Sequence, residues 1–345
     1  MKIAQITSTS LSVPPKSHGG TEFMVYHLVE ALVARGHDVE LFASGDSKVN
    51  ATLNAVVDVA TTYDSGVTTY LDKETETRNT YNLYRQGDRF DVIHSHWPTL
   101  APYFSPFTAT PTLVTYAYIE RPLHDYYRAN FPNVRPVCVS KSQARMLGDE
   151  NLPVVYNGID LSTVPFTESP GEFLVIVGRI VPNKGIADAI RIARRAGERL
   201  VIVGSPSAYL PWSQRYYAEE VSPFVDGDRV RLIEHLPNKE VLELVSQARA
   251  FLFPLQWEEP FGLAVAEALA GGTPVVTYPK GAMPEIVRDG ETGFLVETED
   301  EAVRALAKVG TIQRERCRRW IGERFTMDRM VTCYEQLYRE IRPEA

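Results

Sequence analysis

The segment FLVIVGRIVPNKG, at residues 173–185, decides the fold class. Its leading apolar run is typical of a strand buried on both faces, because a strand with one face in water alternates apolar and polar residues. A stretch with helical spacing follows, and its apolar face consists of Ile186, Ala189, Ile190 and Ala193. The alternation continues through RLVIVG, VRLIEHL, AFLFPL and TPVVTY, between residues 199 and 278. Strands that alternate with helices in this way indicate a doubly wound α/β domain with a parallel sheet.

The first half of the chain shows the same alternation. Its expected strands are KIAQI, DVELFA, DVIHSH, TLVTYA and PVCVS, and TEFMVYHLVEALVARG is expected to be a helix that stops at Gly36. Residues 46–88 are polar and rich in threonine, and their pattern predicts no order of elements. Glycines and prolines at 156–172 indicate a linker. We therefore expect two Rossmann-like domains facing across a cleft, with ligands at the carboxyl ends of the strands.

Composition excludes several classes of protein. The 345 residues suit two domains, and a net charge of −8 argues against nucleic acid as the main partner. No apolar run approaches the roughly 20 residues that span a bilayer, and the segment MKIAQITSTS is too polar for a signal peptide. The 3 cysteines have no CxxC spacing, which predicts a reducing compartment without disulfides or a zinc site. We expect a cytoplasmic protein with at most peripheral membrane contact.

Two cations follow the strand at 173–177. Arg179 and Lys184 lie at its carboxyl end, where ligands bind in such sheets. A guanidinium beside an ammonium suits a diphosphate. The alternative is a pair of solvated surface cations, the usual role of basic residues.

The segment EEPFGLAVAEALAGGTPVV, at 258–276, places two acids around the start of a short helix. The helix is expected to begin near Gly262, with Glu259 in the preceding loop and Glu267 one turn inside. The amides expected to face a phosphate are those of Phe261, Gly262 and Leu263. Glu259 would accept hydrogen bonds from a sugar, and Glu267 from two ribose hydroxyls. Together with the basic loop, this set matches a nucleoside-diphosphate sugar, although acids near a helix start also stabilise the helix dipole.

A glycine pair lies in SHGGTEF, at 17–23, between the first strand and the first helix. Gly19 and Gly20 would let the backbone approach a ligand closely, and the helix start would offer free amides. A glycine pair is also common in loops that bind nothing. The dinucleotide-binding pattern GxGxxG is absent from the sequence.

These motifs together resemble the retaining glycosyltransferases of family 4, which have the GT-B fold. The Glu-x7-Glu signature of that family fits Glu259 and Glu267. Its basic loop, GR-x-x-P-x-KG, fits residues 178–185, and the segment NGID at 157–160 also fits. The resemblance covers nearly the whole chain and is most specific in the second half.

The resemblance implies a domain organisation. An acceptor-binding domain would comprise residues 1–163, and a nucleotide-sugar-binding domain residues 164–325. The last segment, 326–345, would be a helix that crosses back to the first domain.

The resemblance also assigns roles to residues. Arg179 and Lys184 would contact the donor diphosphate, Glu259 the transferred sugar and Glu267 the ribose. Gly19 and Gly20 would approach the donor from the first domain. Further donor-binding positions would be Gly178, Gly204, His235 and Leu236, the last two beside the base. The implied donor is a UDP-sugar, and the implied chemistry uses neither a cofactor nor a metal.

One position departs from the family pattern. A family histidine is expected shortly after the strand TLVTY, where this chain has Ala117. Candidates to replace it are Glu120, His124, His94 and His96, of which we favour His96, and Tyr116 lies on the same acceptor side. His94 and His96 alternate with Ser95 and are expected on one face at a strand end. They could equally be packed and hydrogen-bonded in the wall of the site, and no third metal ligand is evident.

The predicted function is transfer of a hexose from a UDP-sugar, with UDP-glucose as the first guess, to an unidentified small molecule, glycan or lipid. Configuration would be retained and no metal would be needed. The alternatives are a sugar-nucleotide epimerase on the same fold and a non-catalytic binder of nucleotide sugars.

Two further charged segments are expected to have structural roles. The segment RERCRRWIGER, at 314–324, is expected to be a helix with a solvated basic face, and DGD, at 226–228, is expected to be a turn.

Overall fold

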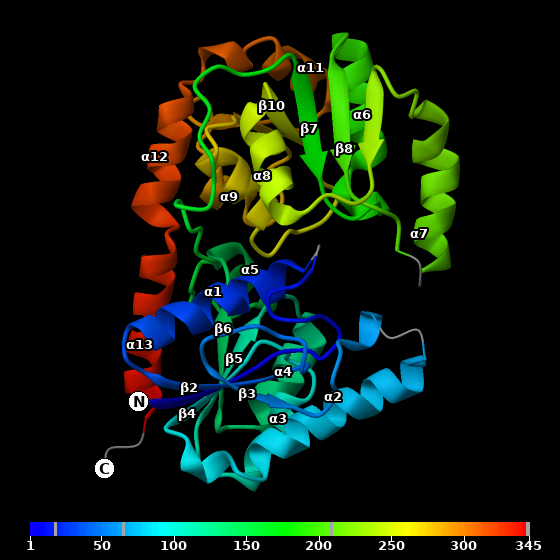
Figure 1. The fold of residues 1–345 in the computed structure, drawn as a ribbon. Helices are drawn as coiled ribbons and strands as arrows, with labels where there is room; N and C mark the ends of the chain where they lie inside the picture. Colours follow the sequence, from blue (N-terminus) through cyan, green and yellow to red (C-terminus); the bar gives the residue numbers. More distant parts are fainter. Residues whose placement is uncertain (17–18, 64–65, 208–209, 343–345) are drawn as a thin grey trace. The chain divides into compact units, whose positions relative to one another are not determined.

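The structure is a computed structural model that describes residues 1–16, 19–63, 66–207 and 210–342. The chain forms two compact units (Figure 1). The first unit comprises residues 1–158 together with the last helix, α13 (Met327–Ile341), and the second comprises residues 159–326. The sequence predicts domain boundaries at residues 163 and 325.

The first unit is built around a six-stranded parallel sheet with the order β3-β2-β1-β4-β5-β6. Its strands are β1 (Lys2–Ile6), β2 (Asp38–Ala43), β3 (Thr52–Ala55), β4 (Val92–Ser95), β5 (Thr112–Tyr116) and β6 (Val134–Cys138). Its helices besides α13 are α1 (Gly20–Ala34), α2 (Thr69–Tyr84), α3 (Ala101–Phe104), α4 (Arg121–Asn130) and α5 (Lys141–Leu147). The five strands expected from apolar runs are confirmed, and β3 is added at the sheet edge.

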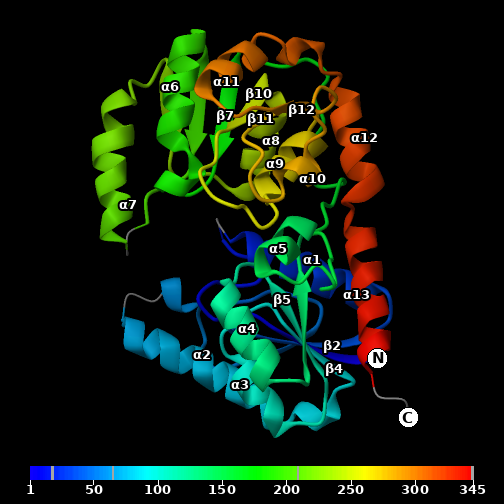
Figure 2. The ribbon, with the colours of Figure 1, turned by 180° about the vertical axis from the view of Figure 1, so that it is seen from behind.

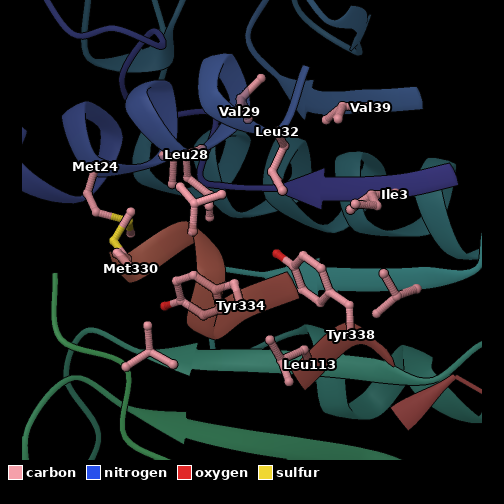
Figure 3. Packing of buried hydrophobic residues seen from close by; sticks show 14 of the residues in the cluster. Ile3, Met24, Leu28, Val29, Leu32, Val39, Leu113, Met330, Tyr334 and Tyr338 are labelled. Carbon is pink, nitrogen blue, oxygen red and sulfur yellow. The ribbon is translucent and has the colours of Figure 1, made fainter. Parts of the chain in front are cut away.

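Helix α13 completes the core of the first unit. Figure 3 shows Tyr334 and Tyr338 of α13 among residues of α1, β1 and β5, with Met330 against Met24. The buried residues that α13 contributes to this core are Met330, Val331, Tyr334, Leu337 and Tyr338. A helix separated from α1 by almost 300 residues of sequence is therefore part of the same hydrophobic core.

Helix α2 lies in the region whose order the sequence did not predict. Its buried residues are mostly polar, namely Thr75, Glu76, Asn79 and Thr80, and only Leu83 and Tyr84 near its end join the hydrophobic core. Glu76 accepts hydrogen bonds from the Ser8 hydroxyl at 2.5 Å and the Thr9 amide at 2.8 Å. A helix that packs through hydrogen bonds shows no apolar period, which is why the pattern failed here.

The second unit has a parallel sheet with the order β12-β11-β10-β7-β8-β9 (Figure 2). Its strands are β7 (Phe173–Val177), β8 (Arg199–Val203), β9 (Val230–Ile233), β10 (Ala250–Phe253), β11 (Val275–Thr277) and β12 (Gly293–Leu295). Its helices are α6 (Ile186–Ala196), α7 (Pro211–Tyr216), α8 (Asn238–Gln247), α9 (Leu263–Ala270), α10 (Met283–Ile286), α11 (Glu299–Leu306) and α12 (Arg314–Arg324). The predicted apolar face of α6 is buried, as expected. Across the described residues, no helix is both long and apolar enough to cross a bilayer.

The prediction of a solvated basic face on α12 is wrong for two of its arginines. Arg314 is buried and donates to three backbone carbonyls and to Thr273. Arg318 donates to the carbonyls of Leu161, Val164 and Ala270. Because a guanidinium offers five N–H groups, these side chains tie α12 to neighbouring segments of the second unit.

The turn expected at 226–228 is confirmed, since the Asp226 carboxylate accepts hydrogen bonds from three following backbone amides.

Candidate active site

The two predicted cations of the second unit differ in their surroundings. Arg179, after β7, has an exposed side chain that makes no ion pair with any described residue. The ammonium of Lys184 is mostly buried and lies over the rings of Phe253 and Trp257, at 5.6 and 5.1 Å from their centroids. Arg179 is thus available to an incoming anion, whereas Lys184 is held in place.

Lys184 is held by Glu259. Its Nζ lies 2.5 Å from Oε2 of Glu259, and both side chains are less than 15% exposed. The indole nitrogen of Trp257 donates to the same oxygen at 2.8 Å. The structure therefore brings together two residues that the sequence predicted to contact adjacent parts of one ligand. Trp257 was missed, although it lies two residues before Glu259.

The backbone before α9 is tightly packed. Gly262 is the residue before the helix and has φ +95°, and Phe261 is buried. A Cβ on Gly262 would lie 2.6 Å from the terminal methyl of Met283. The amides of Val265 and Ala266 donate to the Gly262 carbonyl. The earlier amides of this helix start, including that of Leu263, have no partner within the helix, as at the start of any α-helix.

The surroundings of Glu267 differ from those of Glu259. It lies inside α9 and is half-buried, and no hydrogen bond or ion pair joins its carboxyl group to any residue that the structure describes. Burial raises the pKa of Glu267 to about 7. A desolvated carboxyl group without a protein partner is a candidate ligand-binding group.

Glycines allow the loops of this sheet edge to approach one another. A Cβ on Gly204 would lie 1.9 Å from the carbonyl oxygen of Gly178, and one on Gly185 would lie 2.1 Å from that of Pro254. Glycine is therefore required where the ends of β7, β8 and β10 meet. His235 and Leu236 follow β9, the former exposed and the latter half-buried.

The glycine pair of the first unit lies at the start of α1. Gly19 precedes the helix with φ +136°, and a Cβ there would lie 2.7 Å from Oε2 of Glu22. Gly20 is the first residue of α1 and is exposed. Burial raises the pKa of Glu22. Ser17 and His18, which belong to the same motif, lie outside the described residues.

His94 and His96 are packed against each other inside the first unit. Their ring centroids are 4.0 Å apart, which confirms that they share one face of β4. His94 is hydrogen-bonded to Tyr338 and Thr115, and His96 to Gln5. Burial lowers the pKa of His96 to about 3. Burial and, to a lesser extent, the neighbouring His96 lower the pKa of His94 well below its usual value. Both imidazoles are therefore neutral at physiological pH.

The other candidates lie after β5. Ala117 and Glu120 are exposed, and Tyr116 is buried. His124, on α4, is 1% exposed, and its ring lies edge-on to that of Tyr116 at 5.8 Å. Neither ring nitrogen of His124 has a hydrogen-bond partner in the described structure. Groups of three or more side chains suited to a metal ion were not found among the described residues.

Two family models match consecutive parts of the chain. The model described as Glycosyltransferase Family 4 matches residues 18–163, and that described as Glycosyl transferases group 1 matches residues 164–324. The glycogen synthase of Mycobacterium tuberculosis is 27% identical over 360 residues, which cover 88% of this chain and 84% of that protein.

Solved structures share the fold. The sucrose-phosphate synthase of Thermosynechococcus elongatus superposes with a TM-score of 0.79 at 19% identity, covering 99% of this chain and 98% of that one. HepE of Anabaena, in complex with UDP-glucose, superposes with a TM-score of 0.75 at 16% identity, covering 98% and 99%.

These neighbours and the two parallel sheets define the GT-B fold. The chain itself belongs to glycosyltransferase family 4, as its motifs and both family models show.

Proposed function

We propose that this chain transfers a hexose from a nucleoside-diphosphate sugar to a hydroxyl acceptor, with retention of configuration and without a metal ion. The observation that carries the proposal is the contact between Lys184 and Glu259 beside the exposed Arg179. The ammonium of Lys184 and the carboxylate of Glu259 are already adjacent. The diphosphate and the sugar are neighbouring groups of one donor, so residues that bind them must also be neighbours.

Donor binding would exchange partners within this pair. A diphosphate carries more negative charge than one carboxylate, so it would draw Lys184 from Glu259. Glu259 would then accept hydrogen bonds from the sugar, while the Trp257 indole keeps its carboxylate oriented. Glu267 has free lone pairs for the two ribose hydroxyls.

The same cations would stabilise the departing diphosphate. Arg179, Lys184 and the amides at the start of α9 would face the negative charge that develops as the glycosidic bond breaks. A phosphate oxygen of the donor would take the acceptor proton on the same face of the sugar, which would retain the configuration. This route needs neither a protein base nor a metal.

UDP-glucose is the first donor to test. HepE of Anabaena, which shares the fold, has been solved with UDP-glucose and with UDP. The starch synthase IV of Arabidopsis thaliana, which also shares it, has been solved with ADP. The choice of UDP therefore rests on analogy, and binding measurements with several nucleotides are needed to identify the base.

Calorimetric titration with UDP, GDP, ADP and NAD, in the presence of a chelator, tests the donor site. One nucleoside diphosphate should bind the wild type, and its affinity should fall at least tenfold (about 1.4 kcal/mol) in Glu267→Gln. Glu240→Gln, on an exposed position of α8, is the matched control and should bind normally. If no diphosphate binds, if only NAD binds, or if both variants bind alike, the donor site is misassigned.

Product analysis separates the competing activities. NMR of the glycoside formed should show the anomeric configuration of the donor, and an inverted product would refute retention. A second nucleotide sugar formed without any acceptor would instead identify an epimerase. Tight binding without turnover, across sugar and polyol acceptors, would identify a binding protein.

A further inference from the structure

Six buried side chains form a continuous hydrogen-bonded chain through the first unit. In order they are His96, Gln5, Tyr338, His94, Thr115 and Tyr334. Successive polar atoms are 2.7 to 3.0 Å apart, and no member is more than 1% exposed. The chain begins just beyond β4 and ends on α13, whose two tyrosines are seen in Figure 3.

Gln5 sets the direction of this chain. Its amide oxygen faces His96 and can only accept, whereas its amide nitrogen faces Tyr338 and can only donate. His96 must therefore carry its proton on Nε2. Tyr338 accepts from Gln5 and gives its own proton to Nδ1 of His94. His94 then donates from Nε2 to Thr115, whose hydroxyl is hydrogen-bonded to Tyr334.

This direction leaves one atom of His96 without a proton or a partner. A neutral imidazole has a single N–H, so with Nε2 protonated Nδ1 is a bare lone pair. Nδ1 is buried and has no hydrogen-bond partner among the described residues. A buried acceptor without a partner is unfavourable, and such atoms in native proteins require an explanation such as a ligand.

The position of His96 indicates the kind of ligand. It directly follows β4, at the carboxyl edge of a parallel sheet, where α/β proteins bind substrates. Oγ1 of Thr9, in the loop after the adjacent strand β1, is likewise buried without a partner among the described residues. An unpartnered acceptor at this edge suits a ligand with hydroxyl groups, because a hydroxyl can donate.

We propose that Nδ1 of His96 accepts a hydrogen bond from a hydroxyl of a sugar or polyol acceptor other than the hydroxyl that reacts, and that Gln5 and Tyr338 are positioning residues that fix this tautomer. The inference rests on the proposed transferase function. It gives the last helix a role in substrate recognition, through a hydrogen bond that joins residues 333 positions apart.

Nitrogen NMR of the 15N-histidine-labelled full chain tests the tautomer, with His96→Gln used to assign the signals. Wild-type His96 should show a protonated Nε2 and an unprotonated Nδ1, unchanged below the ordinary histidine pKa of about 6.5. Tyr338→Phe removes the acceptor of Gln5 and should give a mixed tautomer. A protonated Nδ1 in the wild type, or an unchanged spectrum in Tyr338→Phe, would overturn the proposal.

Tyr334→Phe is the matched control. It removes the same hydroxyl from the same buried helix face, but Tyr334 lies at the far end of the hydrogen-bonded chain, beyond Thr115. Its His96 tautomer should therefore be that of the wild type. Equal effects of the two substitutions would show that the tyrosines only support the core.

Kinetics then test the acceptor role, with UDP-glucose as donor and glucose as acceptor. Because a misoriented acceptor reacts more slowly, Tyr338→Phe should lower kcat by about tenfold and His96→Gln by about 100-fold, while UDP affinity stays unchanged and Tyr334→Phe stays normal. An unchanged kcat in His96→Gln would overturn the acceptor role. If the wild type binds no nucleoside diphosphate, the proposed function fails instead, and the NMR result still decides the tautomer.

Discussion

Two glutamates of one motif are placed in opposite electrostatic situations. Glu259 shares a cation and an indole N–H, whereas Glu267 is half-buried with no partner in the described structure. The first is stabilised as a carboxylate before any ligand arrives. Burial disfavours the ionised form of the second. Hydrogen bonds from a ligand would compensate this desolvation and stabilise the carboxylate of Glu267.

Glu267 should make stability depend on pH. Its folded pKa of about 7 exceeds the reference value of 4.5, so the folded state holds its proton more tightly than the unfolded state. Stability should be greatest below the unfolded pKa, fall as pH rises toward about 7 and then level off. Denaturant unfolding should therefore show Glu267→Gln gaining on the order of 1–3 kcal/mol over the wild type between about pH 4 and about pH 8. A pH-independent difference, like that expected for the exposed Glu240→Gln, would contradict this.

Lys184→Met should lower turnover by about 100-fold, because the diphosphate loses a preorganised cation in a partly dry site. Steady-state kinetics with the nucleotide sugar selected by calorimetry measure the effect. Lys239→Met is a suitable control, since that lysine is 85% exposed and should leave kcat unchanged. Normal turnover in Lys184→Met would refute the assigned stabilisation of the leaving group.

Residues of the candidate site could be predicted from the sequence where they belong to a short motif with a characteristic spacing. Lys184 and Glu259 lie in short motifs, and their role as ligand-facing groups follows from strand ends. Their mutual contact was not predictable, because it joins residues 75 positions apart. The link between Gln5 and Tyr338 was hidden for the same reason, and both residues look like ordinary core positions in the sequence.

At the scale of elements, the second sheet depends on close backbone approach. The loops after β7 and β8 meet so closely that a Cβ on Gly204 would overlap the carbonyl oxygen of Gly178. Since Gly178 precedes Arg179, this contact also fixes where the basic loop begins.

Gly204→Ala should therefore destabilise the second unit by about 3 kcal/mol or more, from strain at positive φ together with the overlap. Gly197→Ala separates the two contributions. Gly197 also has positive φ, at +72°, but a Cβ there would meet nothing within 4 Å, so about 1 kcal/mol is expected. Chemical denaturation of both variants provides the comparison, and equal losses would mean that the approach to Gly178 is unimportant.

Elements were predictable in proportion to how apolar their buried faces are. The strands β1, β7 and β8 are runs of apolar residues, and they lie where the sequence places them. Helix α2 was missed because threonine, glutamate and asparagine side chains form its buried face. Its packing depends on specific hydrogen bonds, which residue type alone does not reveal.

At the scale of the whole chain, the first unit is discontinuous in sequence. Its core needs the five buried side chains of α13, which follow the complete second unit. Burying such a side chain contributes roughly 1.5–3 kcal/mol. Their sum is comparable to the entire stability of a typical domain, which is about 5–15 kcal/mol.

A chain that ends at residue 326 should consequently lose the folded first unit while keeping the second. Two-dimensional NMR or calorimetry should then show one cooperative unit instead of two. A chain that ends at Ile341 is the control, since it removes the Arg342–Asp91 ion pair but no core residue. Two intact units in the shorter chain would show that α13 is dispensable.

The late position of α13 also has a consequence for synthesis on the ribosome. Domains made first usually fold first, but here the amino-terminal one must wait until the final helix has left the exit tunnel. The uninterrupted second unit can finish earlier, so the nascent chain emerges with all strands of the first sheet but without the helix that completes the core of the first unit. Pulse proteolysis of stalled nascent chains should find residues 159–326 resistant before residues 1–158. The first unit is thus completed by a helix that is translated after the whole of the second unit.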